Sequence, residues 1–331
     1  MNDVLIKLVD SELMIFWSGS IWCSGFQGAT TEELCNRWVS VGAFYPFSRV
    51  HNEKWNPPSE PYRWASVADA ARNAILMRYR LLPYLYSLTY EAHYLGSPIA
   101  RPLFFLHPAD KKAVGVDRQF YLGTALMVAP VVEEGGRSVD VYFPSGSWWN
   151  LENFTHVVTT ENGTELEVDA PLGHIPVYVR GGCIVPMQQG RMTLREVRTT
   201  PLSLVIVFDH KEARAVGDVR VSSGFLYIDD GKDLVAMSGD DFVAFLSFSA
   251  VVDGKGRGHV TAEGSGGKYL EKLNMTLGSI VVVGVHNDLS GVRRSNDTVE
   301  LRHVTKIEEG FHVQVDMPLM HFNNISWTQM E

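Results

Sequence analysis

The sequence predicts an α+β protein of several domains, with helices in its first third and β-sandwich domains after them. Helical patterns are confined to residues 25–97, whereas residues 98–331 contain short apolar runs separated by Gly, Pro, Asp and Ser about every 8 to 12 residues. Because the helices precede the strands instead of alternating with them, separate domains are expected. A chain of 331 residues is long enough for two or three domains with cores of their own.

Two helical regions are expected before residue 98. The first begins at Thr30-Thr-Glu-Glu33, since a Thr cap satisfies orphan N–H groups and glutamates are favourable at the positive end of a helix. It should stop at Gly42 and be followed by a buried strand over Ala43–Phe47. The longest helix is expected over residues 66–95, with apolar residues at spacings of three and four and a kink at Pro83. We expect the first β-sandwich to cover this long helix.

The region after residue 98 has the rhythm of β-sandwiches, with a soft domain boundary near residues 185–200. Clear strand candidates are Ala125–Ala129, Val139–Phe143, Val177–Val179, Leu202–Phe208 and Ile280–Val283.

Composition and charge narrow the function classes. Apolar residues make up 45% and charged residues 20% of the chain, as in ordinary globular proteins. The net charge of −9 argues against binding of nucleic acid or of an anionic membrane, both of which favour a basic face. No apolar run reaches the length of about 18 residues that a spanning helix needs. No cofactor is expected.

The three cysteines form no metal-ligand pattern, so no metal site is expected. Cys23 and Cys35 are close enough in sequence to form a disulfide, which would leave Cys183 unpaired. Three buried thiols are an equally good interpretation.

Five N-x-Ser/Thr sequons favour a protein that passes through the secretory pathway. Their asparagines all follow residue 150 and are Asn153, Asn162, Asn274, Asn296 and Asn324. The N-terminus, however, does not have the pattern of a signal peptide, because Lys7, Asp10 and Glu12 interrupt any apolar core. We therefore expect a parent protein whose N-terminus lies further upstream.

Several motifs occur together in a fixed order and carry a family resemblance. They are Thr30-Thr-Glu-Glu-Leu-Cys35, Arg37-Trp38, Gly42-Ala-Phe-Tyr-Pro-Phe47, Arg49-Val-His51-Asn52, Met77-Arg-Tyr-Arg-Leu-Leu-Pro-Tyr-Leu-Tyr86, Pro98-Ile-Ala-Arg-Pro102 and Gly173-His-Ile-Pro-Val-Tyr-Val-Arg-Gly-Gly182. Over residues 25–190 the chain resembles glycoside hydrolase family 31, the α-glucosidase and α-xylosidase family. Phe225-Leu-Tyr-Ile-Asp-Asp-Gly231 extends the likeness weakly.

The resemblance implies a division of the chain. The family has a (β/α)8 barrel followed by proximal and distal β-sandwiches. The expected division is an unmatched segment at 1–24, a remnant of the last two strand–helix units of the barrel at 25–97, and antiparallel proximal and distal sandwiches at 98–185 and 186–331.

The resemblance also implies a sugar pocket at the end of a barrel strand. His51 matches a histidine that hydrogen-bonds a sugar hydroxyl, and neutral imidazole supplies both a donor and an acceptor. Phe26 matches an aromatic residue that lines the pocket, and Arg49 matches an arginine that braces it. The implied ligand is an α-linked glucoside or a related oligosaccharide.

The catalytic residues of the family have no counterpart here. A retaining glycosidase needs two carboxyl groups about 5 to 5.5 Å apart. Neither the Trp-x-Asp-Met-Asn-Glu motif of the nucleophile nor the Gly-Asp-Asn motif of the acid/base occurs in the chain, and Trp22 stands where a sugar-binding Asp is expected. Glu53, Glu60 and Asp229-Asp230 are interpreted as solvated loop charges.

These departures lead to two hypotheses. The first is the C-terminal portion of a retaining α-glucosidase, inactive alone and in need of the missing barrel half. Its parent would be lysosomal, vacuolar or extracellular. The alternative is a non-catalytic carbohydrate-binding or accessory β-sandwich protein, which the generous supply of aromatic residues favours.

Overall fold

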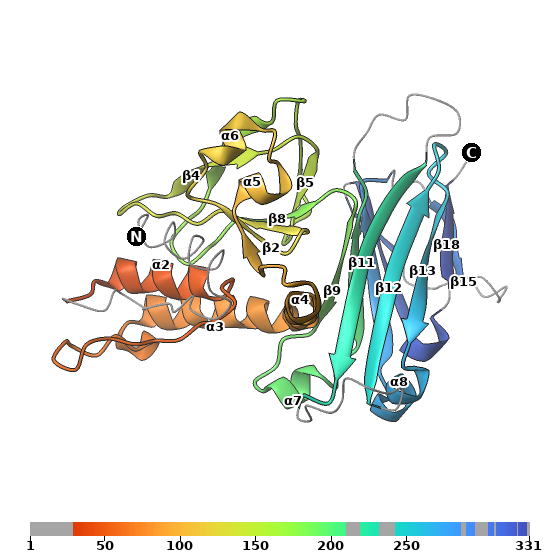
Figure 1. Ribbon diagram of the computed structural model, residues 1–331, viewed down its shortest axis with the longest axis horizontal. Coiled ribbons are helices and arrows are strands. Elements are labelled where there is room, and N and C mark those ends of the chain that lie inside the picture. The colour runs from red at the N-terminus through yellow and green to blue at the C-terminus, as the bar shows by residue number, and fades with distance from the viewer. Residues whose placement is uncertain are drawn as a thin grey trace.

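The computed structural model describes residues 29–209, 219–231, 242–285, 289–294, 304–307, 309–322 and 324–329. Its helical part, a first group of strands and a large sheet follow one another along the chain, and they meet around helix α4 (Figure 1). The helices are α2 (Glu32–Gly42), η1 (Pro61–Arg63), α3 (Ala65–Arg80), α4 (Leu82–Leu95), α5 (Leu103–Leu106), α6 (Lys111–Val114), α7 (Leu194–Val197), α8 (Gly267–Leu273) and η3 (Leu319–His321).

Helix α2 confirms the first predicted helix. The hydroxyl of Thr31 accepts a hydrogen bond from Leu34 N at 3.2 Å, which satisfies one orphan donor of the first turn. Cys35, Trp38 and Val41 recur at the spacing of one helical face and are buried.

The strand predicted over Ala43–Phe47 is wrong. The residues form turns and bends after α2, and the amides of Phe44 and Tyr45 bond back to the carbonyls of Val41 and Gly42 at 2.9 and 3.3 Å. A strand needs a neighbouring strand to satisfy its backbone groups, and no described strand pairs with this segment. The prediction of burial was nevertheless correct for Ala43, Phe44 and Tyr45.

The long helix predicted over residues 66–95 is two helices. Helix α3 ends at Arg80, and α4 starts at Leu82 with Pro83 in its first turn. Proline fits a first turn because the N–H it lacks would have no partner there. The predicted interruption at Pro83 is therefore confirmed, and Leu81 forms the joint.

The first group of strands forms a sandwich of two antiparallel sheets. One has the order β1-β2-β3-β8-β5-β6, made of Ala100–Arg101, Phe120–Leu122, Leu126–Val128, Val177–Arg180, Ser147–Asn150 and His156–Val158. The other pairs β4 (Ser138–Phe143) with β7 (Thr164–Asp169). Tyr121, Phe143 and Trp148 fill the space between them, with Trp148 stacked on Tyr121 at 5.9 Å.

The large sheet has ten described strands and curls into two layers around one core. Its order is β15-β18-β13-β12-β11-β9-β10-β14-β17-β16, made of Leu289–Arg294, Asn324–Gln329, Gly258–Ser265, Val243–Val252, Arg220–Asp229, Cys183–Gln188, Leu202–Val207, Thr276–Val283, Gly310–Pro318 and Val304–Ile307. Two neighbouring pairs, β9–β11 and β10–β14, are parallel, which departs from the all-antiparallel expectation. The chain enters this sheet at β9, slightly before the boundary expected at 185.

Helix α4 joins the two β regions. Tyr84 donates to Leu122 O at 2.8 Å and accepts from Ala125 N at 3.2 Å, so it holds the β2–β3 turn. On the other side, Ser87 Oγ accepts from Tyr227 N of β11 at 2.9 Å. The proximal sandwich therefore covers one side of α4, as expected, and the large sheet, which was not expected to contact this helix, covers another.

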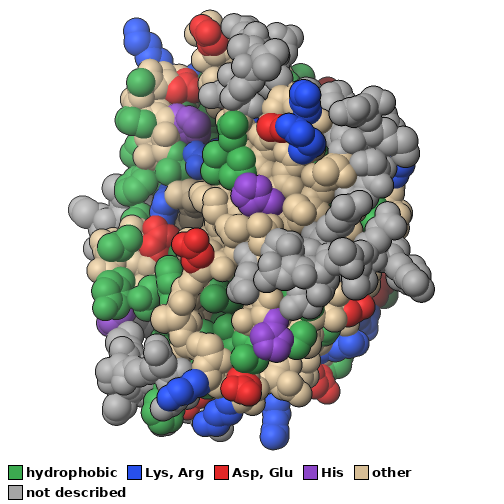
Figure 2. Space-filling model, turned by 90° about the vertical axis from the view of Figure 1, so that its right-hand side faces the viewer, with side chains coloured by type: hydrophobic (Ala, Val, Ile, Leu, Met, Phe, Trp, Pro, Cys, Tyr) green, Lys and Arg blue, Asp and Glu red, His purple; other side chains and the backbone are tan. Residues whose placement is uncertain are grey.

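Figure 2 shows the side of the large sheet that faces away from the helices. Acidic and basic side chains are interspersed over the described part of this face, without a broad basic area.

Candidate functional site

The predicted sugar-binding residues lie on the segment that follows α2. Ala43, Phe44 and Tyr45 are buried, and the chain then comes to the surface, where Phe47 is 43% exposed. Arg49 and His51 are both exposed on this segment, and the Arg49 guanidinium carbon lies 5.8 Å from the centre of the Phe47 ring. Phe26, the third predicted residue, lies outside the described residues.

Arg78 of α3 fixes the beginning of this segment. Its guanidinium donates to three backbone carbonyls, those of Ala43 at 2.7 Å, Tyr45 at 2.5 Å and Pro46 at 3.0 Å. Burial lowers the pKa of Arg78, but an arginine stays charged at physiological pH. The guanidinium of Arg78 thus binds the carbonyls that a neighbouring strand would otherwise bind. It thereby fixes the position from which the exposed residues after Pro46 continue.

The loop after His51 returns to the helices through local contacts. Asn52 Nδ2 donates to Pro57 O at 2.8 Å, and Arg63 donates to Pro58 O. Ser59 is buried, and its carbonyl lies 3.7 Å from the sulfur of Cys35 in α2. His51 therefore sits on a loop whose two ends are both anchored to the helical part.

The carboxylates that the sequence predicted to be solvated loop charges have different surroundings in the structure. Glu53 and Glu60 are partly buried rather than fully solvated, and Glu60 Oε2 is a buried oxygen without a hydrogen bond in the described part of the chain. Asp229, at the end of β11, accepts hydrogen bonds from Tyr86 at 2.7 and 2.8 Å and from Tyr227 at 3.1 Å. These hydrogen bonds connect α4 to β11 of the large sheet, and none of them involves the segment around His51.

The Thr-Thr-Glu-Glu and Arg-Trp motifs attach α2 to the first sandwich. Glu33 pairs with Arg37 at 2.5 Å and accepts from Gly135 N at 2.8 Å, while Arg37 donates to Gly136 O at 2.5 Å. The hydrogen bond from Arg37 is the largest cause that lowers the pKa of Glu33. These contacts position the helix from which the candidate site emerges.

The predicted glycosylation sites differ in their surroundings. Asn153, Asn162 and Asn274 are exposed in turns or at a helix end, and Asn153 Oδ1 accepts from the hydroxyl of Thr155 at 2.8 Å. Asn324 is the first residue of β18 (Asn324–Gln329); its side chain is partly buried, with its Oδ1 buried. Asn296 lies outside the described residues. Modification of these asparagines stays a prediction.

Cys35 and Cys183 are buried free thiols. Cys23 lies outside the described residues, so its pairing with Cys35 stays a prediction. The described residues hold no group of three or more His, Cys, Asp or Glu that could bind a metal ion. None of the described helices is long and apolar enough to cross a membrane.

Comparison with known proteins gives the same family in two adjacent parts of the chain. Residues 11–88 match the model described as "Glycosyl hydrolases family 31 TIM-barrel domain", and residues 96–185 match "Glycosyl hydrolase family 31 C-terminal domain". This chain belongs to glycosyl hydrolase family 31. The barrel match starts at residue 11, so the likeness extends further toward the N-terminus than the motifs had suggested.

Characterised relatives are much longer than this chain. It is 41% identical to α-xylosidase 1 of Arabidopsis thaliana over 81% of its own length, but spans only 28% of that protein. It is 38% identical to the lysosomal α-glucosidase of Rattus norvegicus over 83% of its length, spanning 30% of the relative. The chain therefore corresponds to under a third of these family 31 enzymes.

Solved structures of family 31 enzymes are likewise longer than this chain and match it over almost its whole length. The glucosidase II α subunit superposes with a TM-score of 0.78 at 23% identity, covering 93% of this chain and 34% of that one, which establishes the shared fold. The family 31 dextranase of Flavobacterium johnsoniae superposes with a TM-score of 0.74 at 25% identity, covering 93% and 39%. The barrel remnant and the sheets thus correspond to part of a family 31 enzyme.

Sequence reasoning missed Arg78 and Tyr86. Both lie within Met77–Tyr86, one of the motifs of the family resemblance. A motif in the sequence, however, does not indicate which of its side chains contacts another helix or strand. The role of Arg78 follows only from its hydrogen bonds to three backbone carbonyls. The role of Tyr86 follows from its hydrogen bond to Asp229, which lies 143 residues away in the chain.

Proposed function

We propose that this chain is the C-terminal portion of a retaining glycoside hydrolase acting on α-linked glucosides or related oligosaccharides, and that it requires an upstream barrel half. The observation that carries the proposal is its similarity, over about four-fifths of its length, to α-xylosidases and α-glucosidases of which it spans under a third. Because neither carboxylate motif of the family occurs in this sequence, other residues would have to complete the site. Alone, it should not hydrolyse maltose or an aryl α-glucoside.

The residues of this chain supply binding rather than bond cleavage. Retaining hydrolysis needs a nucleophilic carboxylate and an acid/base carboxyl, which the upstream half would contribute. His51 would then donate to one sugar hydroxyl or accept from it, and Arg49 and Phe26 would brace and line the same pocket. The exposure of Arg49 and His51 supports this arrangement, because residues of a pocket wall are accessible until the opposite wall is in place.

A secretory parent belongs to the same proposal, in a lysosome, in a vacuole or outside the cell. The name of the rat relative, lysosomal α-glucosidase, and the exposed asparagines of three sequons support it.

A chimera tests the proposal directly. Residues 25–331, which include Phe26, would replace the corresponding C-terminal part of the barley α-glucosidase, which is 40% identical to this chain. We expect saturable maltose hydrolysis, which His51→Ala should reduce at least about tenfold in kcat/KM, since it removes a hydrogen bond to the sugar. Arg80→Ala, an exposed change on α3, should leave kcat/KM unchanged.

Three outcomes would speak against this proposal. A folded chimera without activity would argue that this segment cannot complete the site. Equal effects of His51→Ala and Arg80→Ala would remove His51 from the pocket. Saturable hydrolysis by the 331-residue chain alone would show that the upstream carboxylates are not needed.

Carbohydrate binding without catalysis is a second candidate, favoured by aromatic rings where α4 meets the large sheet. Tyr90 stacks on Tyr227 at 4.1 Å and contacts Phe245 at 5.8 Å, while Tyr94 is 68% exposed beside it. Aromatic faces stack on the apolar faces of sugars. Calorimetric titration with maltotriose tests it: binding that Tyr94→Ala abolishes would support this function, and the absence of heat would remove it.

A further inference from the structure

Strand β4 has one edge that no described strand covers. It pairs with β7, and at its far end the buried side chain of Gln119 takes the place of a second neighbour. Gln119 Nε2 donates to Tyr142 O at 3.0 Å, and Tyr142 N donates to Gln119 Oε1 at 2.8 Å. A carboxamide has the same donor and acceptor as a peptide group, so this edge already binds one peptide-like group.

The alternation of an antiparallel ladder shows which other groups face the same way. In such a pair, every second residue directs its N–H and C=O to the partner strand. Tyr142 directs both groups to Gln119, away from β7, so Asp140 and Ser138 do the same. The hydrogen bond from Ala170 N to Arg137 O, at 2.8 Å, agrees with this because it places the odd-numbered residues on the β7 side. Among the described residues, no hydrogen bond uses the outward backbone groups of Ser138 and Asp140.

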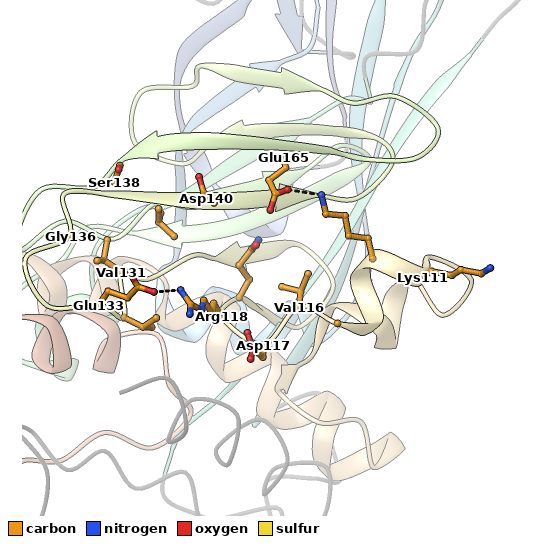
Figure 3. Close-up of a pocket in the computed structure, with 15 residues that line it drawn as sticks. Lys111, Val116, Asp117, Arg118, Val131, Glu133, Gly136, Ser138, Asp140 and Glu165 are labelled. Carbon is orange, nitrogen blue, oxygen red and sulfur yellow. Dashed lines mark hydrogen bonds and ion pairs between the residues drawn. The ribbon is translucent and has the colours of Figure 1, made fainter.

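These groups open into a cleft of about 620 Å³ (Figure 3). Val116 and Val139, both partly buried, contribute apolar surface to it, whereas Val131 is only 3% exposed and lies beneath this surface. Ion pairs stand on its rim, Lys112 with Glu165 at 2.6 Å and Arg118 with Glu133 at 2.5 Å. A strand whose edge has unpaired backbone groups can bind an extended peptide as a further strand, and apolar surface beside that edge can take alternate side chains of the peptide.

We propose that the β4 edge binds an extended peptide segment in trans, as a third strand of the β4–β7 sheet, and that the segment alternates apolar with basic residues. Its apolar side chains would pack on the valines of the cleft. Basic residues are favoured by charge, since the lining residues outside the two described ion pairs are Asp117, Asp140 and Lys111, two acidic against one basic. This site is independent of the proposed glycosidase function.

Fluorescence polarisation with a labelled Lys-Val-Lys-Val-Lys peptide tests the proposal on the whole chain. We expect saturable binding. Backbone N-methylation removes donors, and only alternate residues of a bound strand donate to β4. Of two peptides, one methylated at both valines and one at the three lysines, only one should therefore lose affinity, by about tenfold or more. Equal loss in both, loss in neither, or no saturable binding up to 1 mM peptide would overturn the proposal.

Two variants of Asp140 distinguish the contribution of its backbone N–H to peptide binding from the contribution of its negative charge. Asp140→Pro removes an N–H that faces the cleft, and proline is tolerated on an edge whose N–H faces away from the ladder. It should weaken binding about tenfold or more, whereas Asp140→Asn, which keeps the backbone donor, should weaken it no more than about threefold. Equal loss in both would mean attraction by charge alone and would refute strand addition.

The oligomeric state in solution is the last quantity to measure. Light scattering should give a monomer for the wild type and for Asp140→Pro. A wild-type dimer that Asp140→Pro dissolves would identify a second copy as the occupant and would overturn the peptide assignment. If Asp140→Pro fails to fold, the two methylated peptides still decide the outcome.

Discussion

Replacing Arg78 tests whether a side chain substitutes for a missing strand in holding residues 43–46. Arg78→Met keeps most of the aliphatic stem and removes three hydrogen bonds from a charged donor to the carbonyls of Ala43, Tyr45 and Pro46. Hydrogen bonds to charged groups contribute about 1.5 to 3 kcal/mol each. Three that share one half-buried guanidinium are not additive, and water reaches part of the site, so we expect a loss of about 3 kcal/mol in the free energy of unfolding.

Urea denaturation followed by tryptophan fluorescence measures the free energy, and amide exchange at Phe44 and Tyr45 reports local opening. Arg78→Lys should recover about a third of the loss, because an ammonium reaches one carbonyl at a time. Arg80→Met, on the exposed side of the same helix, is the matched control and should change stability by under about 0.5 kcal/mol. An Arg78→Met variant that stays within about 0.5 kcal/mol of wild type, without faster exchange at these two amides, would show that Arg78 does not hold this segment.

Two substitutions test contacts between parts of the fold, and one labelling experiment tests the burial of Cys183. The pKa of Glu33 is lowered in the folded protein, so its ion pair with Arg37 stabilises the fold above the ordinary pKa of 4.5, and this stability is lost as the pH falls through the lowered pKa. In thermal melts, Glu33→Gln should therefore be less stable than wild type at pH 7 and nearly equal to it at pH 3. A difference in melting temperature that is the same at both pH values would contradict this prediction. Tyr86→Phe removes the hydrogen bonds to Asp229 and should cost about 1 kcal/mol in urea unfolding, against no change for exposed Tyr94→Phe. Burial raises the pKa of the Cys183 thiol, so Ellman's reagent at pH 8 should label it only after denaturation; rapid labelling of the folded protein would argue against the burial.

The elements that the sequence predicted correctly depend on neighbours in the chain. The cap at Thr31 acts within one turn of α2, and Pro83 interrupts the helix through its own ring and its missing N–H. Alternation of apolar residues and turn residues likewise located the five strand candidates named from the sequence, for example Val139–Phe143 within β4 and Leu202–Phe208 around β10.

The errors share a different origin. Ala43–Phe47 has the composition of a buried strand, but a strand exists only beside another strand, and here the guanidinium of Arg78 takes the carbonyls instead. The parallel pairing of β10 with β14, some seventy residues later, likewise depends on how the chain crosses between layers and leaves no local pattern.

The candidate site divides in the same way. The sequence alone determined the family, the order of its motifs and the absence of the catalytic carboxylate motifs, because these are properties of the string of residues. Only the tertiary structure decided that His51 and Arg49 are exposed, that Arg78 sets their position and that Tyr86 reaches Asp229. The same holds for the open edge of β4, since which backbone groups lack a partner depends on segments that meet only after folding.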